Sequence, residues 1–116
     1  MTIPTTLFGI RYDTQDAAVS ADFWAALLRR TVNPGASSES ASIAPGDDPS
    51  SGPTLMFHRV PEAKTVKNRI HFDLVTTAFD AELARVVGLG ATVRASFEAW
   101  TTLADPEGNE FDLIRG

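Results

Sequence analysis

Two histidines and one late carboxylate are the side chains of this sequence best suited to bind a metal ion or to transfer a proton. His58 and His71 lie in residues 53–74 (PTLMFHRVPEAKTVKNRIHFDL), and Asp112 lies in residues 103–113 (LADPEGNEFDL). Apolar residues flank each of them, as in a half-buried strand whose side chains alternate between two faces. We therefore expect the three side chains to point away from the core and to share one surface.

The composition limits the partners of such a surface. With 15 Asp and Glu against 10 Lys and Arg, the formal net charge is -5, which argues against nucleic acid because phosphate binding needs a cationic face. Cysteine is absent, so a metal site would use imidazole and oxygen ligands. No apolar run is long enough to cross a bilayer, and the start (MTIPTTLFG) lacks the regions of a signal peptide. We expect a cytoplasmic protein without a membrane partner.

The length of 116 residues and the hydrophobic content of 43% suit one compact domain. Its first half predicts a strand, a helix and three strands. The helix is predicted from DAAVSADFWAALLRR, in which large apolar residues recur on one side, with Asp16 in its first turn and arginines in its last. Asp13 and Thr14 are predicted to form a turn before it, and the polar stretch 35–52 allows only weak strands. The predicted elements are strand 6–12, helix 16–30, strands near 31–33 and 39–44, and strand 54–60, with Val19, Phe23, Trp24, Leu27 and Leu28 facing inward.

The second half repeats this order, which indicates two copies of one unit packed together. Gly88 and Gly90 suit the end of its helix, and the Pro and Gly of residues 105–109 suit a tight turn before the last strand. The predicted elements are strand 69–75, helix 78–87 with Phe79, Leu83, Val86 and Val87 on one side, and strands 91–96, 99–104 and 110–115.

Several separated motifs resemble one known family. They are the FW of the first helix, the run VPEAKTVKNRIHFDL, the LGA after the second helix, and the closing DPEGNEF. Together they resemble the glyoxalase-like branch of the vicinal oxygen chelate superfamily, which includes glyoxalase I, extradiol dioxygenases, and bleomycin and fosfomycin resistance proteins. The resemblance implies an α+β fold in which two βαβββ modules, at about 1–62 and 66–116, form a curved mixed sheet around a concave cavity, with the helices outside.

The resemblance also implies positions for metal ligands, because the metal-dependent members take them from the first and last strands of each module. These positions fall at about Gly9, His58, His71 and Asp112. Gly9 has no side chain to donate, so the implied ligands are His58, His71 and Asp112, a set used by non-haem iron and some zinc sites. The implied cofactor is a divalent metal (Fe, Mn, Ni or Zn).

A metal so held would favour lyase, isomerase or dioxygenase chemistry on a small oxygenated molecule. Glu110 or Asp73 would move the proton, because strand parity places both on the face of the ligands. Arg11, on the face that carries Gly9, is expected to pair with Asp73 or to attract an anionic substrate. The alternative function is metal-free binding of an aromatic or antibiotic-like compound, with Met56 and Trp100 in the pocket.

Structural roles compete with several of these assignments. His71 and Asp73 would also serve as hydrogen-bonding partners across strands. Trp100 follows a polar stretch, so it is expected either to stack on a ligand in the cavity or to pack against a partner subunit. Relatives of this length frequently pair, and open sheet edges favour pairing, so we expect a homodimer.

Overall fold

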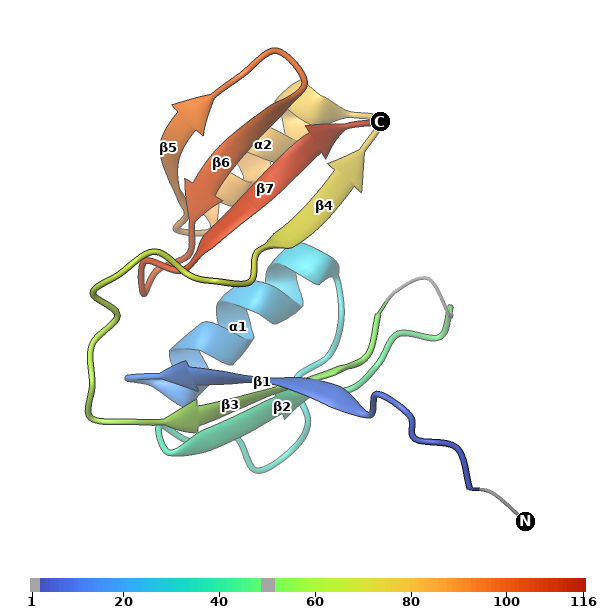
Figure 1. Cartoon of the computed structure of the whole chain (residues 1–116), viewed down its shortest axis with the longest axis vertical. Coiled ribbons are helices and arrows are strands. Elements are labelled where there is room, and N and C mark those ends of the chain that lie inside the picture. Colours follow the sequence, from blue (N-terminus) through green and yellow to red (C-terminus); the bar gives the residue numbers. More distant parts are fainter. Residues whose placement is uncertain (1–2, 49–51) are drawn as a thin grey trace. The chain divides into compact units, whose positions relative to one another are not determined.

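The computed structural model of the chain describes residues 3–48 and 52–116, which divide into two compact units, Met1–Pro61 and Glu62–Gly116. Each unit combines one helix with one mixed sheet (Figure 1). The predicted α+β class is therefore confirmed. Each helix packs on one face of its own sheet, so it does not cover the side chains that point to the other face.

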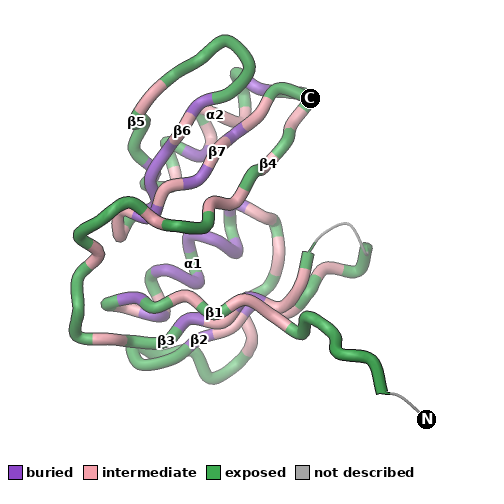
Figure 2. The backbone as a smooth tube through the Cα atoms, in the orientation of Figure 1, coloured by how far each residue is buried: buried purple, intermediate pink, exposed green. Residues whose placement is uncertain are grey.

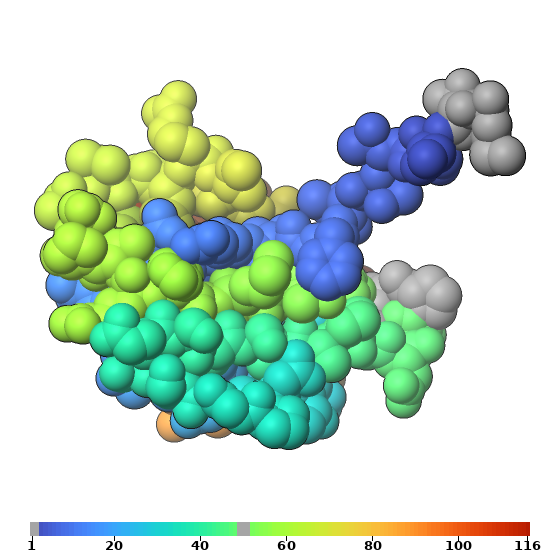
Figure 3. Space-filling view, turned by 90° about the horizontal axis from the view of Figure 1, so that it is seen from below, coloured from blue at the N-terminus to red at the C-terminus, as the bar shows by residue number. Residues whose placement is uncertain are grey.

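The first unit contains β1 (Gly9–Thr14), α1 (Ala17–Leu28), β2 (Ser40–Ile43) and β3 (Thr54–Arg59), and its sheet has the order β1-β3-β2. Strand β3 is parallel to β1 and antiparallel to β2. Figure 3 shows these three segments side by side in this order, from blue through green to teal. The central position of β3 places its outward side chains between those of two neighbours.

The second unit contains β4 (Phe72–Thr76), α2 (Phe79–Gly88), β5 (Thr92–Ser96), β6 (Trp100–Ala104) and β7 (Glu110–Arg115), with the sheet order β4-β7-β6-β5. Its parallel pair, β4 with β7, corresponds to β1 with β3 of the first unit. The predicted strand near 31–33 is wrong as a strand, because only a single bridge joins Val32 to Ile43. Pro34 and Gly35, whose φ is 91°, turn the chain away immediately afterwards.

The cores lie between each helix and its sheet, where the buried segments of Figure 2 concentrate. Trp24 is fully buried in α1 and stacks on Tyr12 of β1, with ring centroids 5.9 Å apart. Tyr12 in turn stacks on Phe57 at 5.6 Å. Two residues that were predicted to lie on the inward faces of the helices are not buried, since Val19 is 50% exposed and Val87 is 43% exposed.

Several predicted boundaries are corrected by hydrogen bonding. Strand β1 begins at Gly9 and includes Asp13 and Thr14, which were predicted to form a turn. Thr14 extends the ladder because its carbonyl oxygen accepts from Val60 N at 2.8 Å. Helix α1 ends at Leu28, since Arg29 has a φ of 53° and caps the helix in the left-handed conformation. The predicted first strand of the second half, 69–75, begins only at Phe72.

Candidate functional site

Strand pairing brings the predicted residues of the first unit into two rows on the open face of its sheet. Arg11 of β1 and Ser42 of β2 are the Cα partners of Met56 on β3. In the next row, Asp13 and Ser40 are the partners of His58. Same-face neighbours along a strand are about 7 Å apart and strands about 5 Å apart, so the side chains of both rows are within reach of one small molecule.

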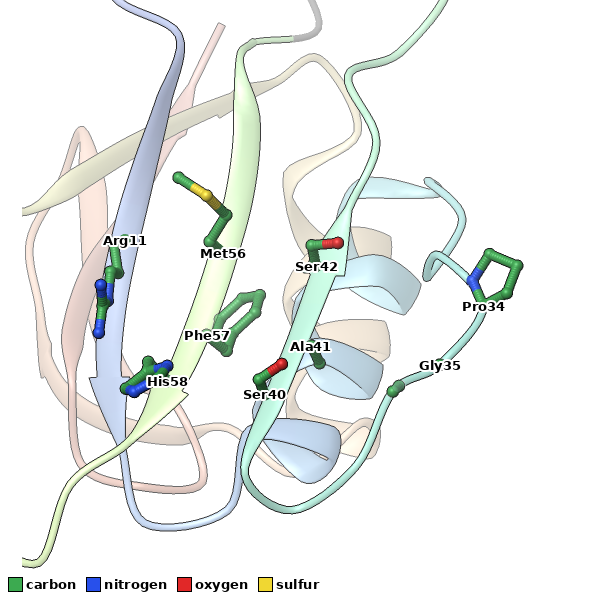
Figure 4. Close-up of a pocket in the computed structure, with 10 residues that line it drawn as sticks. Arg11, Pro34, Gly35, Ser40, Ala41, Ser42, Met56, Phe57 and His58 are labelled. Atoms are coloured by element: carbon green, nitrogen blue, oxygen red, sulfur yellow. The ribbon is translucent and has the colours of Figure 1, made fainter.

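A hollow of about 260 Å³ lies over these rows. Figure 4 shows Arg11 on β1, Met56 and His58 on β3, and Ser40 and Ser42 on β2, with α1 behind the sheet. The loop after α1 supplies the remaining wall. The lining residues are Arg11, Pro34, Gly35, Ala36, Ser40, Ala41, Ser42, Met56, Phe57 and His58.

The Arg11 guanidinium and the His58 imidazole of this lining are available to a ligand. Among the described residues, no hydrogen bond or ion pair engages the side chain of Arg11 or that of His58, and both residues are exposed. The Ser42 hydroxyl accepts from Asn33 Nδ2 at 2.8 Å, which fixes one side of the hollow. A guanidinium, an imidazole and serine hydroxyls around a thioether form a surface suited to an oxygenated anion.

Asp13, Ser40 and Ser42 were not selected from the sequence as site residues. Asp13 was assigned to a turn, and both serines lie in a stretch where Ser, Gly, Pro and Asp obscure the strand. The alternation Ser40, Ala41, Ser42, Ile43 carries the signal, because Ala41 and Ile43 are buried while the serines are not.

In the second unit, His71 lies just before β4 rather than within a strand. Its Nε2 is 2.9 Å from the carbonyl oxygen of Asn68. A carbonyl oxygen only accepts, so this contact assigns the ring proton to Nε2 and leaves Nδ1 as the acceptor. His71 thus joins the loop before β4 through its ring.

Asp73 and Asp112 are Cα partners on β4 and β7, and Thr102 of β6 is the next partner in the row. The Thr102 hydroxyl donates to Asp112 Oδ1 at 2.6 Å. Asp73 is exposed and Asp112 is half-buried. Their pairing confirms that β4 and β7 present both carboxylates on one face, as strand parity predicts.

Glu110 is engaged on both carboxylate oxygens. Lys64 Nζ forms an ion pair with Oε1, and Asn68 N donates to Oε2 at 2.9 Å. Burial by itself would raise the pKa of Glu110, but the contacts from Lys64 and Asn68 outweigh it and lower the pKa from 4.5 to about 2. So weak a base favours a structural role for Glu110 over the predicted proton transfer.

Trp100 also has an aromatic neighbour in its own unit. Its ring stacks on Phe97 with centroids 4.5 Å apart, and the two residues are 37% and 51% exposed. Ile114 and Val75 continue the same row across β7 and β4. The predicted stacking on a ligand and the predicted packing on a partner subunit both remain predictions for this aromatic pair.

The family model of the glyoxalase-like domain matches residues 9–114, a range that includes every helix and strand except the last residue of β7. The chain belongs to the glyoxalase-like domain family. No curated protein matches the sequence closely enough to count as a relative. No described helix of this glyoxalase-like protein is long and apolar enough to span a membrane.

Solved structures resemble the glyoxalase-like chain in fold. The fosfomycin resistance protein FosX from Mesorhizobium loti is 15% identical with a TM-score of 0.72, over 98% of this chain and 94% of that one. A FosX mutant from Listeria monocytogenes, complexed with Mn(II) and 1S,2S-dihydroxypropylphosphonic acid, is 13% identical with a TM-score of 0.71, over 97% and 90%. The oxidase ChaP-H2 is 19% identical with a TM-score of 0.68, over 98% and 95%. At these identities the likeness establishes the fold alone.

The donor set of the first unit does not fit a divalent metal. Gly9 offers no side chain, and His58 shares its face with the permanent cation of Arg11. Across the described residues, His, Asp and Glu do not gather in any group of three that could hold a metal ion. The predicted set of His58, His71 and Asp112 draws on both units and stays a prediction.

Proposed function

We propose that this glyoxalase-like protein binds a small oxygenated anion on the open face of its first sheet, with Arg11 and His58 as the recognition groups. One observation carries the proposal. Arg11 and His58 line the same hollow, and among the described residues neither side chain is engaged by a hydrogen bond or ion pair. An exposed guanidinium beside an imidazole has the chemistry of an anion-binding surface.

The lining residues also limit the class of ligand. Arg11 can donate two parallel hydrogen bonds to a carboxylate, phosphate or phosphonate. Ser40 lies beside His58 and offers a hydroxyl to a neighbouring oxygen, while Met56 and Ala41 provide apolar contact for a short carbon chain. A hollow of about 260 Å³ is near the lower end for small-molecule sites. These features favour a ligand of a few carbon atoms with one acidic group.

Titration with methylphosphonate, followed by isothermal calorimetry and by ¹H–¹⁵N spectra, tests the proposal. An Arg11→Gln variant removes the fixed charge, and we expect binding to weaken about 10- to 100-fold, the loss of a charge-assisted contact. Arg59→Gln is the matched control, because Arg59 pairs with Glu39 at 2.9 Å and does not line the hollow. If both variants bind methylphosphonate like the parent, Arg11 is not the anion site.

A metal-dependent lyase, isomerase or dioxygenase is the second candidate function. It is favoured by the Mn(II) in the FosX complex from Listeria monocytogenes. The metal, taken from Fe, Mn, Ni or Zn, would be held by His58, His71 and Asp112, with Asp73 as the proton carrier. The metal content of protein purified without a His-tag, after incubation with each ion, tests this candidate. Absence of stoichiometric metal would remove it.

We further propose that the protein forms a homodimer. Strands β4 and β5 lie at the edges of the second sheet, where unpaired backbone groups favour association. The exposed pair Phe97 and Trp100 supports this proposal, since aromatic residues are enriched at interfaces. Sedimentation equilibrium measures the mass directly, and a monomer at all concentrations would contradict it.

A further inference from the structure

We infer that this protein binds its anion through the Arg11 guanidinium without a divalent cation, because Gly9 of β1 carries no ligand and Met56 of β3 offers only a thioether beside it. The inference rests on the proposed function, since it concerns how the same hollow retains an anion. It also narrows the ligand class, because a guanidinium selects an acidic group whereas a metal ion also binds neutral oxygens.

The space beside Gly9 is closed by the neighbouring strand. A Cβ atom built on Gly9 would lie 2.8 Å from the backbone carbonyl oxygen of Thr54 and 3.0 Å from Cε of Met56. The first contact is with backbone, which cannot rotate away. No side chain, and therefore no imidazole or carboxylate, fits at this position unless β1 moves away from β3.

Met56 lies beside Gly9 on the neighbouring strand, and its thioether sulfur is a poor ligand for hard divalent ions. It is the Cα partner of Arg11 in the same row of the sheet. A thioether is a soft ligand that hard divalent ions such as Mn(II) and Mg(II) do not select. The guanidinium beside it is positively charged, so a cation in this row would meet repulsion instead of compensation.

The remaining donors of this face are two, His58 and Asp13, which are Cα partners on β3 and β1. Two protein donors hold a divalent ion poorly, because stable sites use three or four. Among the described residues of the first unit, His, Asp and Glu form no group of three that could hold a metal ion.

Arg11 can perform the part of binding that a cation would otherwise perform. Its guanidinium carries a full positive charge and five donors in a fixed plane, which suits two oxygens of one acidic group. The resulting preference is for a carboxylate, phosphonate or phosphate that bears a second oxygen toward His58 and Ser40. Neutral molecules with two vicinal oxygens, which need a metal to hold them, would bind poorly.

The experiment measures methylphosphonate binding to metal-stripped protein in EDTA and, separately, after dialysis against Mn(II). We expect the two dissociation constants to agree within about twofold, and Arg11→Gln to weaken both at least tenfold. The affinity of Arg11→Lys should fall between those of the parent and of Arg11→Gln, because lysine keeps the positive charge but cannot donate two parallel hydrogen bonds. Thermal melts of each variant confirm that the exposed substitution leaves the fold intact.

Three results would overturn the inference. Binding that appears only with Mn(II), or that strengthens at least tenfold with it, would leave anion binding in place and show that a metal is required. If Arg11→Gln and the parent bind methylphosphonate equally in EDTA, a group other than Arg11 binds the anion. No binding under either condition would refute the proposed function itself, and the inference with it.

Discussion

Replacement of Glu110 by glutamine tests the main electrostatic contact of the second unit. The two side chains of the Lys64–Glu110 pair are only 21% and 15% exposed, so solvent screens them little. Glutamine keeps the shape and an oxygen for Asn68 N, but it removes the charge that Lys64 binds. The pair also ties the loop before β4 to the first residue of β7, 46 residues along the chain.

The magnitude follows from the pKa of Glu110, which falls from 4.5 in the unfolded chain to about 2 in the folded one. At about 1.4 kcal/mol per pKa unit, this shift corresponds to roughly 3–4 kcal/mol of stability. The folded pKa is the lower one, so the contribution is complete above pH 4.5 and is lost as the pH falls toward 2. We expect Glu110→Gln to cost roughly 3–4 kcal/mol at neutral pH and almost nothing near pH 2.

Urea denaturation followed by far-UV circular dichroism at several pH values measures this difference. Glu62→Gln is the matched control, because Glu62 lies in the same loop, is exposed and should change stability by less than about 0.5 kcal/mol. A double-mutant cycle with Lys64→Gln isolates the coupling of the pair. The reasoning fails if Glu110→Gln costs nothing at pH 7, or if its cost is the same at low and neutral pH.

Three further substitutions have defined outcomes. Gly9→Ala should destabilise the protein by about 1–3 kcal/mol, because its Cβ would meet a carbonyl oxygen at 2.8 Å. Its control is Gly88→Ala, which has open space around its Cβ and should be close to neutral in the same urea titration. Asp16→Ala should cost about 1 kcal/mol by removing the cap of α1, whereas Asp22→Ala on the exposed side of that helix should not lower the melting temperature. Arg11→Gln should leave stability unchanged while it weakens methylphosphonate binding, which separates the site from the fold.

The elements with regular alternation were predictable from the sequence. In β3 and β7, large apolar residues recur at every second position, Leu55 with Phe57 and Phe111 with Leu113, and all four are buried. The outward directions of Met56 and Asp112 therefore follow from parity. The turn after Asp105 was also predictable, from the Pro and Gly of residues 105–109. In the structure, Gly108 has a φ of 90° and the Asp105 carboxylate accepts from Asn109 N at 2.9 Å. These are local signals, and they fix most of the fold.

Features that depend on distant residues were not predictable. Glu110 was assigned to proton transfer from strand parity, because its partner Lys64 lies 46 residues away in the chain and a single sequence does not reveal the pair. The role of Gly9 depends on how closely Thr54 O approaches it, which a single sequence does not reveal. His71 was placed in a strand, but the loop tethered through Asn68 delays the start of β4.

The short loop at Pro34, Gly35 and Ala36 replaces a full second strand in the first unit and forms one wall of the hollow. Its neighbours are anchored, since Ser37 N donates to Ser40 O and Ser38 O accepts from Ala17 N, both at 2.9 Å. A library randomised at positions 34 and 36, with Gly35 retained for its positive φ, would therefore reshape the pocket entrance without breaking a ladder hydrogen bond. This loop is the natural starting point for engineering the protein to accept larger guests.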